Sequence, residues 1–388
     1  MRVGLDLLYL IPGETGGREI YARELVAAMR APELELVAFV NRDVGAGLAG
    51  ELGDDVRAVV VPVSARNRAQ WALGELLLVS LAARRARVQV LHSMANFAPA
   101  WGHFRRVVTI HDLQYRAVPE LLSPPARAAT HALMSLAARR ADRIIAVSSA
   151  GRDEIVAGLG IAPERIDVVP NGGRAAPPSP DPAGVRERYG LGQRQVALAV
   201  ATNLPHKNLP ALIDALALIA PELRPVLMIG GHGTTDEGLR GKVEDAGLVD
   251  DVRLLGALST TALDALYSAA DCLVLSTLHE GFGLPVLEAM MRSLPVVCSD
   301  LPALREVAGD AALFFDPHAP AQIAARMQEV LGDENLARRM REQGHTQAER
   351  FSWSAAAEGT LASYRRAIER STPTSSDGYA RSSTSSAK

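Results

Sequence analysis

The sequence is poor in cysteine, in lysine and in aromatic residues, and it has no long apolar run. Its two cysteines, Cys272 and Cys298, each lie in a short apolar segment without the CxxC or CxH spacing of metal or redox sites. We therefore predict buried structural thiols in a reducing compartment. No apolar run approaches the roughly 20 residues that cross a bilayer. The apolar start of the chain contains Asp6 and lacks a small-residue cleavage site, which predicts a first strand and a cytoplasmic protein rather than a signal peptide.

Charge and basic residues narrow the range of partners. The net charge is −3 and no stretch interleaves aromatic with basic residues, so we predict no nucleic-acid partner. All but three of the 41 basic residues are arginine. A lysine inside a possible binding loop, such as Lys207, therefore stands out.

The length and the order of apolar segments predict two domains. A chain of 388 residues exceeds one ordinary core. Strand and helix patterns alternate over residues 3–169 and again over 196–315, which predicts an α/β fold with parallel sheets covered by helices on both faces. Active sites in such sheets lie beyond the carboxyl ends of the strands. We expect an N-terminal domain at 1–170, a proline-rich linker at 171–184, a C-terminal domain at 185–352 and a disordered tail at 371–388.

The stretch at residues 279–290 predicts strand, glycine-rich loop and helix. Pro285 suits the first helical position, and Gly281 and Gly283 let the backbone approach a ligand closely. Glu280 and Glu288 stand eight positions apart. Each feature alone has a structural explanation, since a glutamate early in a helix complements the helix dipole. Together, two carboxylates and free backbone amides suit a ligand that carries hydroxyl and phosphate groups.

This stretch resembles the paired-glutamate motif of retaining glycosyltransferases of family 4. The resemblance implies that Glu280 contacts the transferred sugar, that Glu288 contacts the ribose, and that the amides of Phe282, Gly283 and Leu284 lie at the donor. It covers nearly the whole chain except the tail. It implies the GT-B fold, in which two Rossmann-like domains face each other across a cleft, and a helix at about 353–370 that returns to the N-terminal domain.

Two candidate sites lie in the N-terminal half. Gly16 and Gly17 open the first helix, where their amides could hold an anion or simply form a tight turn; the segment is not a dinucleotide fingerprint. The resemblance places this loop at the donor diphosphate. His111 is expected at the carboxyl end of the fifth strand. A lone histidine is more often a packing residue, but the resemblance implies that His111 packs on the sugar and stabilises positive charge at the anomeric carbon.

The corresponding loop of the second half carries Lys207, which can neutralise a phosphate as a point charge. Many members of the family have an arginine five residues earlier, where this chain has Thr202. The departure puts a two-cation clamp on the diphosphate in doubt, and His206 or an arginine from elsewhere could compensate. Residues 205–208, Pro-His-Lys-Asn, resemble a subgroup with bacterial mannosyltransferases, which implies GDP-mannose as donor, with UDP-hexoses next. Ala257 and Leu258 end a predicted strand and could simply form a turn, but the resemblance implies that their backbone contacts the nucleobase.

The predicted reaction uses no cofactor and no metal. The sequence contains no Asp-x-Asp, the pattern with which many sugar transferases hold a divalent ion, and no carboxylate clearly placed as a covalent nucleophile. With these absences, the resemblance to family 4 implies front-face transfer of a hexose to a glycan or lipid-linked acceptor in cell-surface polysaccharide or glycoconjugate synthesis. A nucleotide-sugar epimerase of the same fold and a non-catalytic nucleotide-sugar-binding protein remain as alternatives.

A helix expected at 68–86 combines leucines 76–78 with Arg84, Arg85 and Arg87. Such a basic amphipathic helix can lie on the anionic inner face of the plasma membrane. It can equally be an ordinary helix that covers the sheet.

Overall fold

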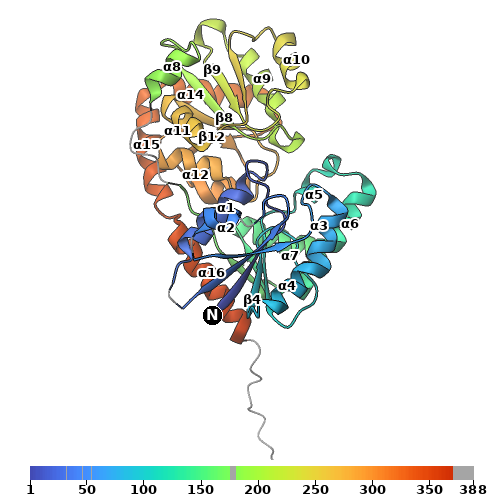
Figure 1. Cartoon of the computed structure of the whole chain (residues 1–388). Helices are drawn as coiled ribbons and strands as arrows, with labels where there is room; N and C mark the ends of the chain where they lie inside the picture. The colour runs from blue at the N-terminus through green and yellow to red at the C-terminus, as the bar shows by residue number, and fades with distance from the viewer. Residues whose placement is uncertain (32, 46, 54, 175–180, 370–388) are drawn as a thin grey trace, which may run out of the picture.

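A computed structural model describes residues 1–369 apart from 32, 46, 54 and 175–180. The predicted tail at 371–388 and the middle of the predicted linker lie outside the described residues. The chain forms two lobes, each built on one sheet (Figure 1). Every strand pair in both sheets is parallel, which confirms the predicted α/β class. None of the helices in this described part has the length and apolar character needed to cross a bilayer.

The N-terminal sheet has the strand order β3-β2-β1-β4-β5-β6-β7. Its central strands are runs of branched apolar residues that are buried because helices cover both faces, whereas the edge strand β3 is partly exposed. The strands are β1 Arg2–Leu7, β2 Glu35–Asn41, β3 Arg57–Val61, β4 Val90–Ser93, β5 Arg105–Ile110, β6 Arg143–Ala146 and β7 Ile166–Val168. The α-helices are α1 Gly17–Ala28, α2 Gly47–Leu52, α3 Arg68–Leu73, α4 Val79–Arg85, α5 Gln114–Ala117, α6 Pro124–Arg140 and α7 Ser149–Leu159.

The C-terminal sheet has the order β10-β9-β8-β11-β12-β13. Its strands are β8 Val196–Val200, β9 Val226–Gly230, β10 Val252–Gly256, β11 Cys272–Leu275, β12 Val296–Ser299 and β13 Ala312–Phe315. The helices are α8 Pro182–Arg188, α9 Leu209–Ala217, α10 Glu237–Asp245, α11 Thr260–Ala269, α12 Leu284–Met291, α13 Pro302–Ala308, α14 Pro320–Gly332 and α15 Glu334–Ala348. Cys272 and Cys298 are buried free thiols, as predicted.

Three local predictions need correction. The helix expected at 68–86 is interrupted by a π-helix, Gly74–Leu78, whose wider turn carries Glu75 inward to the buried Asp6. Helix α12 starts at Leu284, one residue earlier than predicted. Helix α8 begins inside the predicted linker, because the side chain of Asp181 accepts a hydrogen bond from the Gly184 amide at 2.8 Å and caps the helix. Helices α2, α5 and α13 were not predicted.

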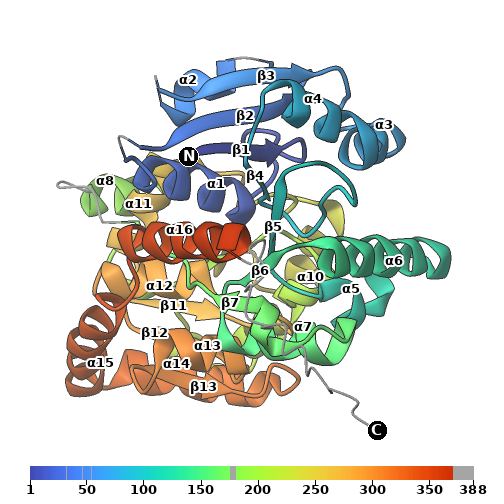
Figure 2. The same cartoon turned by 90° about the horizontal axis from the view of Figure 1, so that it is seen from below.

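The last helix, α16 Trp353–Glu369, lies against α1, β5, β6 and β7 of the N-terminal sheet. Figures 1 and 2 show this red helix alongside that sheet, whereas the preceding helix, α15, belongs to the C-terminal lobe. The chain thus passes between the lobes twice, and the two passages touch. The Gly173 amide donates to the Phe351 carbonyl at 3.4 Å, and Gly172 packs so closely on the Trp353 backbone that a Cβ there would lie 2.2 Å from its nitrogen.

The order of strands predicts where ligands bind. The N-terminal sheet reverses its winding between β1 and β4, and the C-terminal sheet between β8 and β11. Open parallel sheets bind ligands beyond the carboxyl ends of strands at such points. The loops after β1, β8 and β11 contain most of the predicted site residues.

Candidate active site

The loops that follow β8 and β11 are joined by side-chain hydrogen bonds. Ser276 donates to the Lys207 carbonyl at 3.1 Å, and Thr277 donates to the His206 carbonyl at 3.0 Å. This arrangement brings Lys207 Nζ to 2.7 Å from Glu280 Oε2. Two predicted residues, 73 positions apart in sequence, therefore form an ion pair. Their side chains are only 20% and 16% exposed, so the charges are partly shielded from water.

Glu288 projects from α12 and is 3% exposed. The Tyr267 hydroxyl on α11 donates to Glu288 Oε2 at 3.1 Å. Burial raises the pKa of Glu288, while Arg292, the Tyr267 hydrogen bond and Arg174 act in the opposite direction. The Arg292 guanidinium also lies 5.0 Å from the centre of the Tyr267 ring. These contacts fix the position of Glu288, and they join residues that no local sequence pattern connects.

Two helix N-termini meet near the ion pair. Helix α1 begins after Gly16 (φ 58°) and α12 begins after Gly283 (φ 107°), and neither has a side-chain cap. In the described part of the chain, no protein acceptor binds the amides of Gly16, Gly17 or residues 282–284. A Cβ built on Gly17 would lie 3.4 Å from a methyl group of Leu284, so the two termini are adjacent. Free amides at helix N-termini bind anions. The Phe282 side chain is buried in the core and leaves only its amide for a ligand.

His111 follows β5 and is buried between the lobes. Its Nε2 lies 2.8 Å from the Met94 carbonyl oxygen, which can only accept, so Nε2 carries the hydrogen. The Tyr21 ring packs edge-on against the imidazole at 4.8 Å. Burial, and to a smaller extent the charge of Arg18, lowers the pKa of His111 to about 4. The imidazole is therefore neutral near pH 7.

Gly281 allows the lobes to approach at this point. A Cβ built on Gly281 would lie 2.0 Å from the His111 carbonyl oxygen. The sequence predicted a close approach to a ligand here, whereas the structure shows a close approach to the other lobe. Ser148 Oγ reinforces the contact by donating to the Gly281 carbonyl at 2.7 Å.

His206 does not supply the missing positive charge. Burial, and to a smaller extent the charge of Lys207, lowers the pKa of His206 to about 4, so the ring is neutral near pH 7. Its Nδ1 lies 2.5 Å from the Gln114 side-chain amide of the other lobe. Thr202, at the end of β8, is uncharged. Of the two candidates named for the missing cation, an arginine from elsewhere remains.

Further contacts across the interface were not predicted. The carboxylate of Glu306 accepts the Ser149 amide at 2.8 Å and the Ala150 amide at 3.3 Å, and so binds the N-terminus of α7. Ala257 and Leu258, the two residues expected at the nucleobase, follow β10 directly. Ala257 is exposed, while Leu258 packs over Gly230. A role for Ala257 and Leu258 at the nucleobase stays a prediction.

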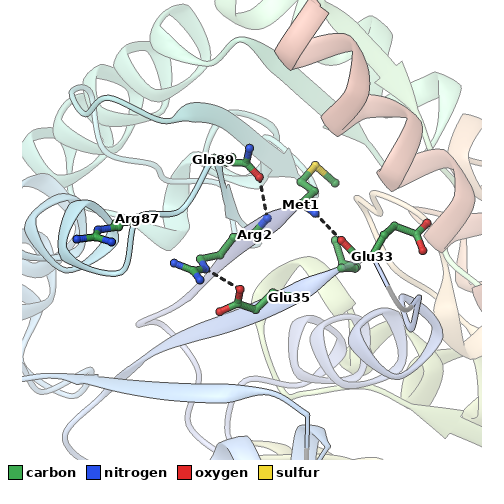
Figure 3. Close-up of a pocket in the computed structure, with 7 residues that line it drawn as sticks. Met1, Arg2, Glu33, Glu35, Arg87 and Gln89 are labelled. Atoms are coloured by element: carbon green, nitrogen blue, oxygen red, sulfur yellow. Dashed lines mark hydrogen bonds and ion pairs between the residues drawn. The ribbon is translucent and has the colours of Figure 1, made fainter.

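A hollow also occurs on the opposite edge of the N-terminal sheet, where β1 and β2 begin (Figure 3). Arg2 pairs with Glu35 at 2.7 Å, its amide donates to Gln89 at 2.9 Å, and the chain's amino group donates to the Glu33 carbonyl. Because these polar groups satisfy one another and lie at the amino ends of the strands, we assign no ligand to this hollow.

Comparison with known families agrees with this geometry. The model described as Glycosyltransferase Family 4 matches residues 15–173, and the model described as Glycosyl transferases group 1 matches residues 185–347. The O-antigen chain mannosyltransferase B of Escherichia coli is 31% identical over 67% of this chain and 70% of its own length. The chain belongs to glycosyltransferase family 4. It is therefore a glycosyltransferase, as the paired glutamates predicted.

A further relative and two solved structures are also similar to this family 4 glycosyltransferase. The MMP alpha-(1->4)-mannosyltransferase of Mycolicibacterium hassiacum is 31% identical over 60% of this chain and 56% of its own length. Sucrose-phosphate synthase of Thermosynechococcus elongatus shares the fold with a TM-score of 0.78 and 19% identity, over 96% of this chain and 100% of that one. HepE of Anabaena, solved with UDP and glucose, has a TM-score of 0.75 and 20% identity, and the match covers 94% of this chain and 99% of HepE. The predicted GT-B fold is confirmed.

Proposed function

We propose that this glycosyltransferase moves mannose, with retention of configuration, from GDP-mannose to a glycan or lipid-linked acceptor in cell-surface polysaccharide synthesis. The observation that carries the proposal is the ion pair of Lys207 with Glu280 beside two free helix N-termini. Support for mannose comes from Pro-His-Lys-Asn at 205–208 and from relatives named mannosyltransferases, two of which are about 31% identical to this chain.

In this proposal the diphosphate binds to Lys207 and to the free amides of the two helices. Donor binding then exchanges the carboxylate of Glu280 for phosphate as the partner of Lys207. Glu280 is left to accept hydrogen bonds from sugar hydroxyls, and Glu288, held by Tyr267, accepts them from the ribose. Preorganised donors that face a developing negative charge give the largest share of catalysis in many enzymes.

His111 suits a reaction in which positive charge grows on the sugar. A protonated imidazole would repel that charge, whereas the neutral ring carries an unshared pair on Nδ1. The acceptor hydroxyl attacks from the face that the diphosphate leaves, and the leaving phosphate takes its proton. In this single transfer the bond from the sugar to the phosphate oxygen breaks, the bond from the sugar to the acceptor oxygen forms, and the acceptor's proton moves to the phosphate. No redox partner is needed.

Mutation of the paired glutamates tests the proposal. Glu288→Ala is expected to weaken GDP binding about 10-fold or more, as loss of hydrogen bonds to a charged group does. Glu280→Ala is expected to keep donor binding and lose transfer. Glu342→Ala, on the exposed side of α15, is the matched control. Affinity is measured by calorimetry with GDP-mannose and UDP-glucose, and an incubation without acceptor separates transfer from epimerisation. Wild-type affinity and turnover in both site variants would contradict the assignment.

We also propose that one surface of the N-terminal lobe contacts an anionic bilayer. Leu73, Leu77 and Leu81 are 47%, 45% and 37% exposed, and α4 ends in Arg84 and Arg85. Arginines beside exposed leucines suit the interface of an anionic membrane, where each basic residue contributes about 1 kcal/mol.

Vesicle binding tests this surface. Arg84→Gln/Arg85→Gln is expected to lose about 30-fold in affinity for phosphatidylglycerol vesicles, and Leu73→Gln/Leu77→Gln is expected to weaken binding as well. Leu218→Gln, which changes an exposed leucine of the other lobe, is the control. Equal binding of wild type to neutral phosphatidylcholine vesicles, or unchanged binding by both double variants, would contradict the proposal.

A further inference from the structure

The proposed diphosphate site is short of positive charge on its C-terminal side. A sugar diphosphate carries two negative charges at neutral pH. Lys207 already pairs with Glu280, Thr202 has no charge, and burial keeps His206 neutral by lowering its pKa to about 4. Even when Lys207 leaves Glu280 for the phosphate, one lysine cannot neutralise two negative charges, so a further cation has to come from another element.

Arg18 stands where such a cation is needed. It is the second residue of α1, directly after the free amides of Gly16 and Gly17. Tyr21 lies one turn further along the same face of the helix, since residues three apart are neighbours on a helix surface. The Tyr21 ring contacts the His111 imidazole at 4.8 Å. Arg18 thus lies on the helix face that contacts His111, and its positive charge is close enough to lower the pKa of that imidazole.

The guanidinium of Arg18 is held by an aromatic ring and lacks a carboxylate partner. It lies 5.9 Å from the centre of the Tyr9 ring, and the Tyr9 hydroxyl donates to the Arg18 carbonyl at 3.2 Å. In the described part of the chain, no Asp or Glu comes within ion-pair distance of it. Arg23, five residues along the same helix, differs in this respect, because it pairs with Glu19 and Glu51, both at 2.8 Å.

We propose that Arg18 is the second diphosphate-binding cation of this enzyme and that it replaces the arginine missing at Thr202. The inference rests on the proposed function and goes one step further. It places one cation on each lobe, Arg18 on the N-terminal and Lys207 on the C-terminal side, so the diphosphate bridges the interface. Only a ligand with a β-phosphate can span both. The enzyme then binds nucleoside diphosphates more tightly than monophosphates, because a monophosphate reaches only one of the two cations.

The preference for diphosphate over monophosphate tests this role. Wild type, Arg18→Ala and Arg18→Lys are titrated by calorimetry with GDP, GMP, UDP and UMP, with Arg23→Ala as the matched control. Arg18→Ala is expected to bind the nucleoside diphosphate about 10- to 100-fold more weakly, as loss of a charge-assisted hydrogen bond predicts. It should bind the monophosphate within about 2-fold of wild type. Arg18→Lys should lie between, and Arg23→Ala should match wild type.

A second substitution shows whether charge alone matters. Adding Thr202→Arg to Arg18→Ala restores a cation on the C-terminal side and is expected to recover diphosphate affinity. The proposal is overturned if Arg18→Ala keeps the wild-type ratio of diphosphate to monophosphate affinity. It is also overturned if the double variant binds no better than Arg18→Ala.

Two further results distinguish an error in the role of Arg18 from an error in the proposed donor site. If Lys207→Ala loses diphosphate affinity while Arg18→Ala does not, Arg18 is excluded and the proposed donor site stands. If wild type binds neither GDP nor UDP, both proposals fall together.

Discussion

Replacing Gly281 by alanine tests whether the fit between the two lobes controls sugar transfer. The new Cβ would lie 2.0 Å from the His111 carbonyl oxygen and 3.1 Å from its carbonyl carbon. Both are backbone atoms at the end of a central strand, so no rotamer change can relieve the clash. Nonbonded atoms prefer separations of about 3.5 Å or more, so the lobes must move apart by at least about 1 Å.

The displacement falls between the groups that are proposed to hold the sugar and the diphosphate. A misplacement of about 1 Å can lower a rate about 100-fold. We therefore expect kcat/KM of Gly281→Ala to fall about 100-fold, while its melting temperature changes little because the residue lies between the lobes. Small-angle scattering should show a larger radius of gyration than wild type.

Gly238→Ala is the matched control for this variant. Gly238 lies in α10, and no atom lies within 4 Å of a Cβ built on it. Alanine should even stabilise that helix by up to about 1 kcal/mol. Wild-type turnover and scattering in Gly281→Ala would refute the claim that this contact sets the geometry of the site.

Three shorter predictions concern neighbouring contacts. Tyr267→Phe removes the 3.1 Å hydrogen bond to Glu288 and should weaken GDP binding about 10-fold; the effect should grow as pH falls, because this bond lowers the pKa of Glu288. Burial, and then the charge of Asp6, raises the pKa of Glu75 well above its usual value. The folded protein thus keeps a proton that the unfolded chain releases, and its stability falls with rising pH by up to about 1.4 kcal/mol per unit. Urea unfolding between about pH 5 and pH 7 should show this slope in wild type and a weaker one in Glu75→Gln, where Asp6, whose pKa burial also raises, still contributes. Glu306→Ala leaves two amides of α7 unpaired at the interface and should lower kcat/KM several-fold; an unchanged value would show that the contact is dispensable.

The strands were predicted well because their sequence signal is local. The strands of the second sheet run from β8, which begins at Val196, to β13, which ends at Phe315, and so fill the predicted range 196–315. A parallel strand buried on both faces needs only a short run of branched apolar residues between polar turns. The π-helix at Gly74–Leu78 has no such local signal. It depends on the contact of Glu75 with Asp6, which lies 69 residues earlier in the sequence.

The residues of the site also differ in whether a local sequence pattern identifies them. Glu280, Glu288 and Lys207 could be predicted because they occupy motifs in which residue type and spacing are fixed. Arg18 and Tyr267 could not, because their importance comes from neighbours on other elements. The sequence showed that a cation was missing at Thr202, whereas finding a substitute required the distance between α1 and His111.

The return of α16 to the first sheet sets the order in which the protein can fold. Tyr364 bonds to His92 at 2.7 Å and Ser363 bonds to Asp167 at 2.6 Å, and Trp353 belongs to the same apolar core as β1. When β7 has just emerged from the ribosome, Trp353, Ser363 and Tyr364 have not yet been synthesised. The polar and apolar groups of the first lobe that α16 covers therefore stay exposed to water until the whole second lobe has been made. The domain that is made first is therefore finished last.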